Sequence, residues 1–90
     1  MDISNGFQIC FGDRTFTSAK NVSAGNSYDV VHGYALAFAN YAGCVLVGTY
    51  NVAFKGSVAE RTKNNFKARL RNIASSATTI EGFVFVAFGY

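Results

Sequence analysis

Residues 78–90 read TTIEGFVFVAFGY, and this closing stretch decides the fold class. If the stretch is extended, successive side chains point to opposite faces. Phe83, Phe85 and Ala87 then lie on one face. The other face is apolar as well, with Val84, Val86, Phe88 and Tyr90. Because a surface strand of a small antiparallel domain normally alternates apolar with polar residues, this pattern predicts a strand covered on both faces, by its own fold or by another copy of the chain.

The composition favours a single small domain, residues 1–90, that associates with itself. Half of the residues are hydrophobic and only 14% are charged, against about 25% in an ordinary soluble domain. A chain of this size has more apolar surface than one core can hide, so we expect the excess to be buried between subunits.

The chain lacks the usual signals for a membrane or a secretory route. No apolar run approaches the roughly 18–20 residues of a membrane-spanning helix, so no membrane insertion is expected. The N-terminal MDISNGF has no basic region followed by an apolar stretch, and so does not resemble a signal peptide. Cys10 and Cys44 each lie within an apolar run, which predicts two buried free thiols.

Most of the chain consists of short runs with strand character. Residues 7–11 and 14–18 flank Gly12-Asp13 and predict a hairpin. Residues 27–38 begin with an alternating pattern, and residues 43–54 are rich in β-branched and aromatic side chains. Turns are expected at 21–27, 41–43 and 75–78, where Gly, Asn and Ser cluster.

Residues 57–76, SVAERTKNNFKARLRNIASS, allow two interpretations. Phe66, Leu70 and Ile73 fit one face of a basic amphipathic helix. The alternation of apolar and basic residues from 66 to 71 fits a strand equally well, and we favour two strands joined near Asn64-Asn65. The whole pattern then predicts an all-β fold, a small antiparallel β-sandwich of about six or seven strands.

The order of these pieces resembles a known family. They are NGFQICFG at the start, YALAFANYAGCVLVGTYN in the middle, NNFKARLRN, and a terminal FVFVAFGY. This order resembles the C-terminal β-sandwich domain of phage tail fibre and receptor-binding proteins, a class that is also similar to the H-type lectins. Two features depart from the family pattern: the middle turn has no proline, and Cys10-Phe11-Gly12 stands where tryptophan-glycine is common.

The resemblance implies a non-enzymatic receptor-binding tip in the virion, made in the host cytoplasm. It would attach to a bacterial surface glycan or another envelope component. The family's trimeric state implies a homotrimer in which one face of the closing strand packs near the three-fold axis. The interface residues would be Val84, Val86, Phe88 and Tyr90.

The sequence offers little for catalysis, a metal or a cofactor. There is one histidine, and Asp29 and His32 should face opposite sides of a strand. A lone histidine without paired cysteines is a poor zinc site, and no glycine-rich phosphate loop is present. We therefore expect no enzymatic activity, no metal and no cofactor.

Two groups of residues are candidates for ligand binding. Sugar recognition uses aromatic faces together with polar side chains, and the candidates for it are His32, Tyr34, Asn40 and Tyr41. Contacts to anionic groups would come from a basic row on one face of a strand, Lys67, Arg69 and Arg71. That row is also compatible with an ordinary solvated face.

Two other functions remain open. One is a structural role, as a trimerisation domain or a capsid decoration protein. The other is a small basic nucleic-acid-binding β protein, which would need exposed aromatic side chains among the basic ones. Phe66 and Leu70 alternate with the basic row and should point inward, so nucleic acid is not the expected partner.

Overall fold

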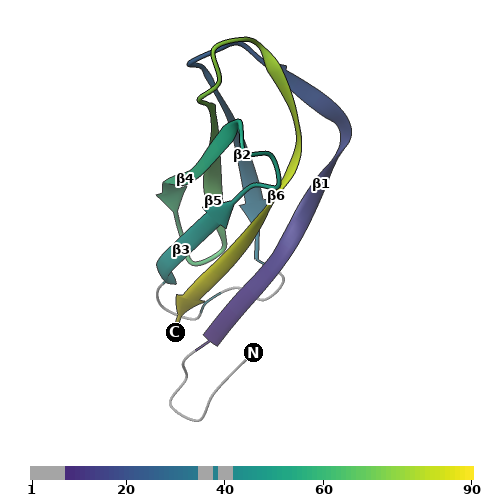
Figure 1. Ribbon diagram of the computed structural model, residues 1–90. Coiled ribbons are helices and arrows are strands. Elements are labelled where there is room, and N and C mark those ends of the chain that lie inside the picture. The colour runs from purple at the N-terminus through teal and green to yellow at the C-terminus, as the bar shows by residue number, and fades with distance from the viewer. Residues whose placement is uncertain (1–7, 35–37, 39–41) are drawn as a thin grey trace.

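The computed structural model describes residues 8–34, 38 and 42–90, and this part of the chain is all-β (Figure 1). It contains no helix, and so none that could cross a membrane. The strands are β1 (Gln8–Val22), β2 (Ser27–Gly33), β3 (Ala42–Gly48), β4 (Phe54–Arg61), β5 (Asn65–Asn72) and β6 (Thr78–Gly89). The predicted all-β fold class is confirmed, and the number of strands is six, the lower of the two expected values.

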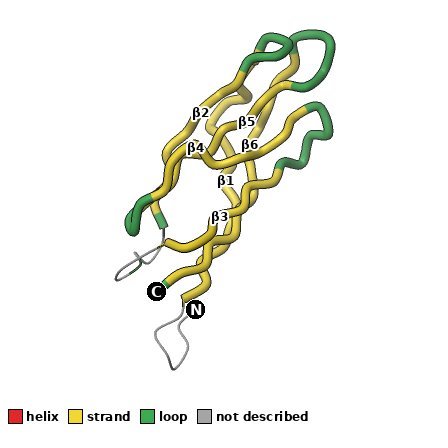
Figure 2. The backbone as a smooth tube through the Cα atoms, turned by 90° about the vertical axis from the view of Figure 1, so that its left-hand side faces the viewer, coloured by secondary structure: helices red, strands yellow, loops and turns green. Residues whose placement is uncertain are grey.

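The strands form two three-stranded sheets, in the orders β1-β6-β3 and β2-β5-β4. All four pairings within these sheets are antiparallel. Figure 2 shows the sheets as two layers, with β6 central in one and β5 central in the other. The predicted antiparallel β-sandwich is therefore confirmed.

The core lies between the two central strands. From β5, the alternate residues Phe66, Ala68 and Leu70 are fully buried. From β6, the buried side chains are Ile80, Phe83, Phe85 and Ala87. Over residues 66–70 of β5 and 83–87 of β6, every second position presents an apolar side chain to the opposite sheet, which is the period of a strand with one face in the core.

The outer face of β6 is apolar but incompletely covered by the described chain. β6 is paired on both edges, and its inner face is buried, as the sequence predicts. On the outer face, Val84, Val86 and Phe88 are only half-buried, and Tyr90 is 53% exposed. The chain's own fold therefore buries only one of the two apolar faces of this stretch.

The predicted hairpin over residues 7–18 is wrong, because β1 runs through Gly12 and Asp13 without a turn. Gly12 pairs with Phe85 and Asp13 with Val84. The long strand β6 offers a continuous row of backbone partners, and this tertiary pairing overrides the local turn preference of a Gly-Asp pair. Irregular pairing occurs instead between Thr15 and Lys20.

The two-strand interpretation of residues 57–76 is confirmed, and the helical alternative is wrong. β4 ends at Arg61 and β5 begins at Asn65. Thr62 organises the turn between them, because its Oγ1 accepts hydrogen bonds from the backbone N–H groups of Asn64 (3.1 Å) and Asn65 (3.0 Å). Such local side-chain bonds favour a turn over a continuing helix.

Asn72, at the end of β5, is a fully buried polar residue that joins three segments. Its Nδ2 donates to the carbonyl oxygens of Val22 (2.8 Å) and Ser76 (3.0 Å). Its Oδ1 accepts from the backbone N–H of Ala74 at 2.8 Å. Because buried polar groups are costly unless bonded, this network fixes the ends of β1 and β5 and the loop after β5 relative to one another.

The two sheets approach closely where β3 meets β4. A Cβ placed on Gly56 would lie 2.6 Å from the carbonyl oxygen of Val47. A real side-chain carbon does not come so close, so only glycine fits this position. Gly56 thereby brings β4 against β3 at one corner of the sandwich.

Candidate functional site

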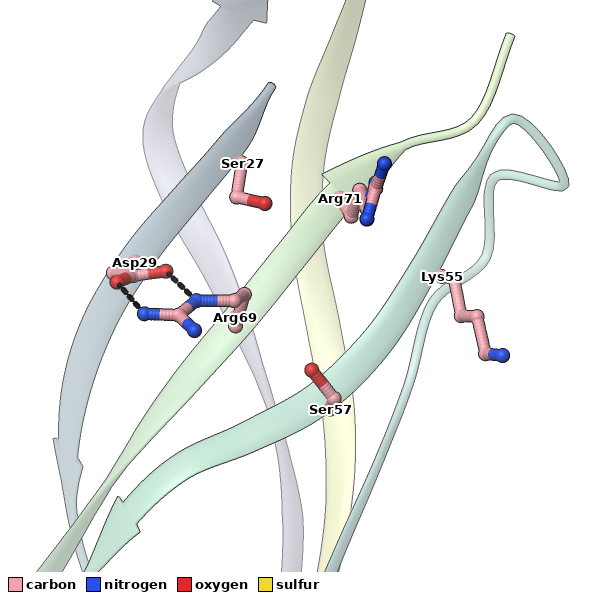
Figure 3. A pocket seen from close by; sticks show the side chains of 6 residues that line it. All are labelled: Ser27, Asp29, Lys55, Ser57, Arg69 and Arg71. Atoms are coloured by element: carbon pink, nitrogen blue, oxygen red, sulfur yellow. Dashed lines mark hydrogen bonds and ion pairs between the residues drawn. The ribbon is translucent and has the colours of Figure 1, made fainter. Parts of the chain in front are cut away.

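The basic row of β5 lies on the outer face of the sheet β2-β5-β4. Strand pairing places six side chains on this face in two rows of three. The first row is Ser27, Arg71 and Lys55, and the second is Asp29, Arg69 and Ser57. We call these six residues the polar face. They also line a shallow hollow of about 560 Å³, shown in Figure 3.

Asp29 and Arg69 form a bidentate ion pair across β2 and β5. Arg69 Nε and Nη2 donate to the two carboxylate oxygens of Asp29 at 3.0 and 2.9 Å (Figure 3). The hydrogen bond from Arg69 is the main cause that holds the pKa of Asp29 below its ordinary value, outweighing slight desolvation. The same bond raises the pKa of Arg69. Both groups therefore keep their charges, and Arg69 is held in one orientation.

Lys67, the next basic residue of the row, is also paired. Its Nζ lies 2.9 Å from Glu60 Oε1 on β4. Both side chains are substantially exposed, so this pair contributes little to stability. Two of the three predicted basic residues thus have their charge matched by a neighbouring strand.

Arg71 lies opposite another cation rather than a carboxylate. Lys55 of β4 is its direct cross-strand partner. A second hollow, of about 390 Å³, also contains both side chains, together with Gly25, Asn72, Ile73 and Ala74. Arg71 and Lys55 therefore stand where two hollows meet, at the end of the sheet fixed by Asn72.

His32 and Tyr34, both proposed as sugar contacts, point toward the core. The His32 ring lies 4.9 Å from that of Phe85 and 5.7 Å from that of Phe66, measured between centroids. Burial among these rings, followed by the charge of Arg14, lowers the pKa of His32. Tyr34 is only 8% exposed. Asp29 and His32 do face opposite sides of β2, as the sequence predicts.

Asn40 and Tyr41, the other two candidates for sugar binding, lie outside the described residues. The structure therefore brings together Arg69 and Arg71 on the polar face, with Lys67 just beyond them, while His32 and Tyr34 lie on the other side of the sheet. Sequence reasoning missed Ser27, Lys55 and Ser57. Their places follow from strand register, which a single exposed lysine or serine does not reveal.

A second candidate surface is the outer face of β1-β6-β3. Register places seven apolar side chains side by side there: Ile9, Phe11, Cys44, Leu46, Val84, Val86 and Phe88. We call these residues the apolar face. Phe11 is 72% exposed and Leu46 is 56% exposed. Soluble monomers rarely leave so continuous an apolar surface in water, and such patches commonly mark interaction sites.

The cysteines do not fit the prediction of two buried thiols. Both are free, but Cys44 is exposed and Cys10 is partly buried. Cys10 pairs with Ala87 on the inner face, whereas Cys44 pairs with Phe88 on the outer face. The sequence did not show that the apolar run around Cys44 belongs partly to an uncovered face. Among the described residues, no group of three or more His, Cys, Asp and Glu side chains could hold a metal ion.

Comparisons with protein families, characterised proteins and solved structures find no match to this chain.

Proposed function

We propose that this chain is the receptor-binding tip of a phage tail fibre, a homotrimer that attaches to a glycan or another component of the bacterial envelope. The observation that carries the proposal is the apolar face, of which a single subunit leaves Phe11, Cys44 and Leu46 exposed to solvent. Neighbouring copies would cover it, and they would leave the polar face on the opposite side of each sandwich available to a ligand. The resemblance of the sequence to tail-fibre domains supports the same assignment.

A trimer suits the shallow character of the polar face. A hollow lined by serines, ion-paired groups and two further cations offers few contacts for a small ligand. One weak site would hold a cell poorly, but three linked sites would gain avidity without any new contact. The proposed function is therefore multivalent attachment without chemical conversion of the ligand.

The experiment is binding of fluorescently labelled protein to a panel of bacterial strains. Attachment to some strains and not others is the expected result. Leu46→Lys, which places a charge in the apolar face, should dissociate the trimer and weaken attachment about a hundredfold through lost avidity. Val52→Lys is the matched control, because Val52 is 95% exposed and lies outside this face. Equal binding of the wild-type protein to every strain, or to none, would contradict the proposal.

A structural trimerisation or decoration role is the second candidate, because the apolar face by itself would suffice for assembly. That role predicts a stable trimer which fails to attach to any strain in the same panel. Nucleic-acid binding has less support, since no aromatic side chain lines the polar face and Phe66 is fully buried.

A further inference from the structure

The outer face of β2-β5-β4 has two more cations than anions. Its described carboxylates are Asp29 and Glu60, and each is taken by a cation, Arg69 and Lys67 respectively. No described carboxylate lies within ion-pair distance of Lys55 or Arg71. The excess positive charge is therefore concentrated at one end of the sheet.

Lys55 and Arg71 are direct cross-strand partners with the same charge. Like charges placed opposite each other destabilise a sheet. In Figure 3 the two side chains extend in different directions, as mutual repulsion favours. An oxyanion bound between them would replace this repulsion by two attractions, and the planar guanidinium of Arg71 can bind an oxyanion through two hydrogen bonds.

The rest of the polar face offers partners for hydroxyl groups. Ser27 and Ser57 each provide a hydroxyl that both donates and accepts. Both oxygens of Asp29 bind Arg69, yet each keeps a further acceptor position. The Asp29 carboxylate, which Arg69 holds on the same face as the two cations, favours a ligand whose sugar ring carries one anionic group beside neutral hydroxyls.

We propose that Lys55 and Arg71 bind the oxyanion of an acidic saccharide, whose hydroxyl groups lie against Ser27, Ser57 and Asp29. The oxyanion is a carboxylate or a phosphate ester attached to a polyhydroxylated ring. Ile73, 58% exposed beside Arg71 in the second hollow, offers an apolar contact for the ring carbons. The inference deepens the proposed function and rests on it for the origin of the saccharide.

The test is titration of the full chain with tetragalacturonate, followed by calorimetry and by amide chemical shifts. Binding should shift amides of β4 and β5 near Lys55 and Arg71. The fully methyl-esterified tetramer keeps the rings and their hydroxyls but lacks the charge, and should bind at least about tenfold more weakly. Mannose 6-phosphate forms the second arm, and the stronger of the two acidic probes identifies the source of the oxyanion.

Arg71→Gln and Lys55→Gln should each weaken binding of the acidic probe about tenfold. Lys63→Gln is the matched control, because it removes the same charge from the exposed turn at the other end of β5 and should leave affinity unchanged. Equal losses in all three variants, equal binding of the methyl ester, tighter binding of single-stranded oligothymidylate, or no binding of either acidic probe would overturn the site. Cell attachment by Arg71→Gln as strong as that of the wild-type protein would overturn the site alone, whereas probe binding without cell attachment would overturn the proposed function alone.

Discussion

The side-chain amide of Asn72 donates a hydrogen bond of 2.8 Å to the backbone carbonyl of Val22, fifty positions earlier in the chain. This bond ties the end of β5 to the end of β1, strands that belong to different sheets. The same end of β5 carries Arg71. The position of the proposed saccharide site is thus fixed by a buried polar network directly beside it.

Replacement of Asn72 should therefore be costly. Asn72→Ala removes three hydrogen bonds and leaves backbone groups unsatisfied in a buried environment, so we expect a loss of about 3 kcal/mol in the free energy of unfolding. Urea unfolding followed by circular dichroism measures the change. Asn21→Ala, at an exposed position of β1, is the control and should change stability by less than about 0.5 kcal/mol. Similar values for both variants would contradict the role assigned to Asn72.

Adding even one methyl group at Gly56 should destabilise the protein. Gly56→Ala places a methyl group against the Val47 carbonyl and must push β4 away from β3, at a cost of about 2 kcal/mol. The matched control is Gly12→Ala, whose new carbon would lie 3.6 Å from the Phe85 ring, an ordinary contact. Thermal unfolding should separate the two variants, with Gly12→Ala close to the wild-type protein. A wild-type melting temperature for Gly56→Ala would show that the two strands are not so closely packed.

His32, the one histidine of the chain, should make stability depend on pH. Its pKa in the folded protein is lowered from 6.5, first by burial and then by Arg14. The unfolded chain therefore takes up a proton at a higher pH than the folded protein does, and the free energy of unfolding should fall as the pH drops below about 6.5. The fall should stop once the pH passes below the folded-state pKa.

The measurement is the urea midpoint at about pH 7.5 and about pH 5 for the wild-type protein and for His32→Leu. The substitution keeps an apolar contact with Phe66 and Phe85 but removes the titrating group. The wild-type midpoint should be lower at the acidic pH than at the higher pH, and the midpoint of His32→Leu should change less. An equal decrease in both proteins would assign the pH dependence to other groups.

The strands with strong period-two patterns could be predicted from sequence. In β5, Phe66 and Leu70 alternate with basic residues, and in β6 every residue from 83 to 88 is apolar. The alternation in β5 reports its buried face directly, because side chains of a strand alternate between faces. The apolar run of β6 predicts a strand but does not show that its outer face is only partly buried. β1 was predicted wrongly because Gly12-Asp13 has a local turn preference that pairing with β6 overrides.

Only part of the candidate site could be predicted from the sequence. The row of basic residues on β5 is visible in the sequence, but its partners are not. Lys55 meets Arg71 only through a register that contains an irregularity between Val58 and Glu60. The bond from Asn72 to Val22 joins positions fifty residues apart and could not be read from the local sequence, whereas the bonds of Asn72 with Ala74 and Ser76 lie within the next four residues.

The central claim is that other copies of the chain cover the apolar face of β1-β6-β3. Sedimentation velocity of the wild-type protein at micromolar concentration tests it most directly, with Leu46→Lys and Val52→Lys alongside. We predict a species of three times the 9.7 kDa chain mass for the wild-type protein and for Val52→Lys, and a monomer for Leu46→Lys. A wild-type protein that sediments as a 9.7 kDa monomer would contradict the claim.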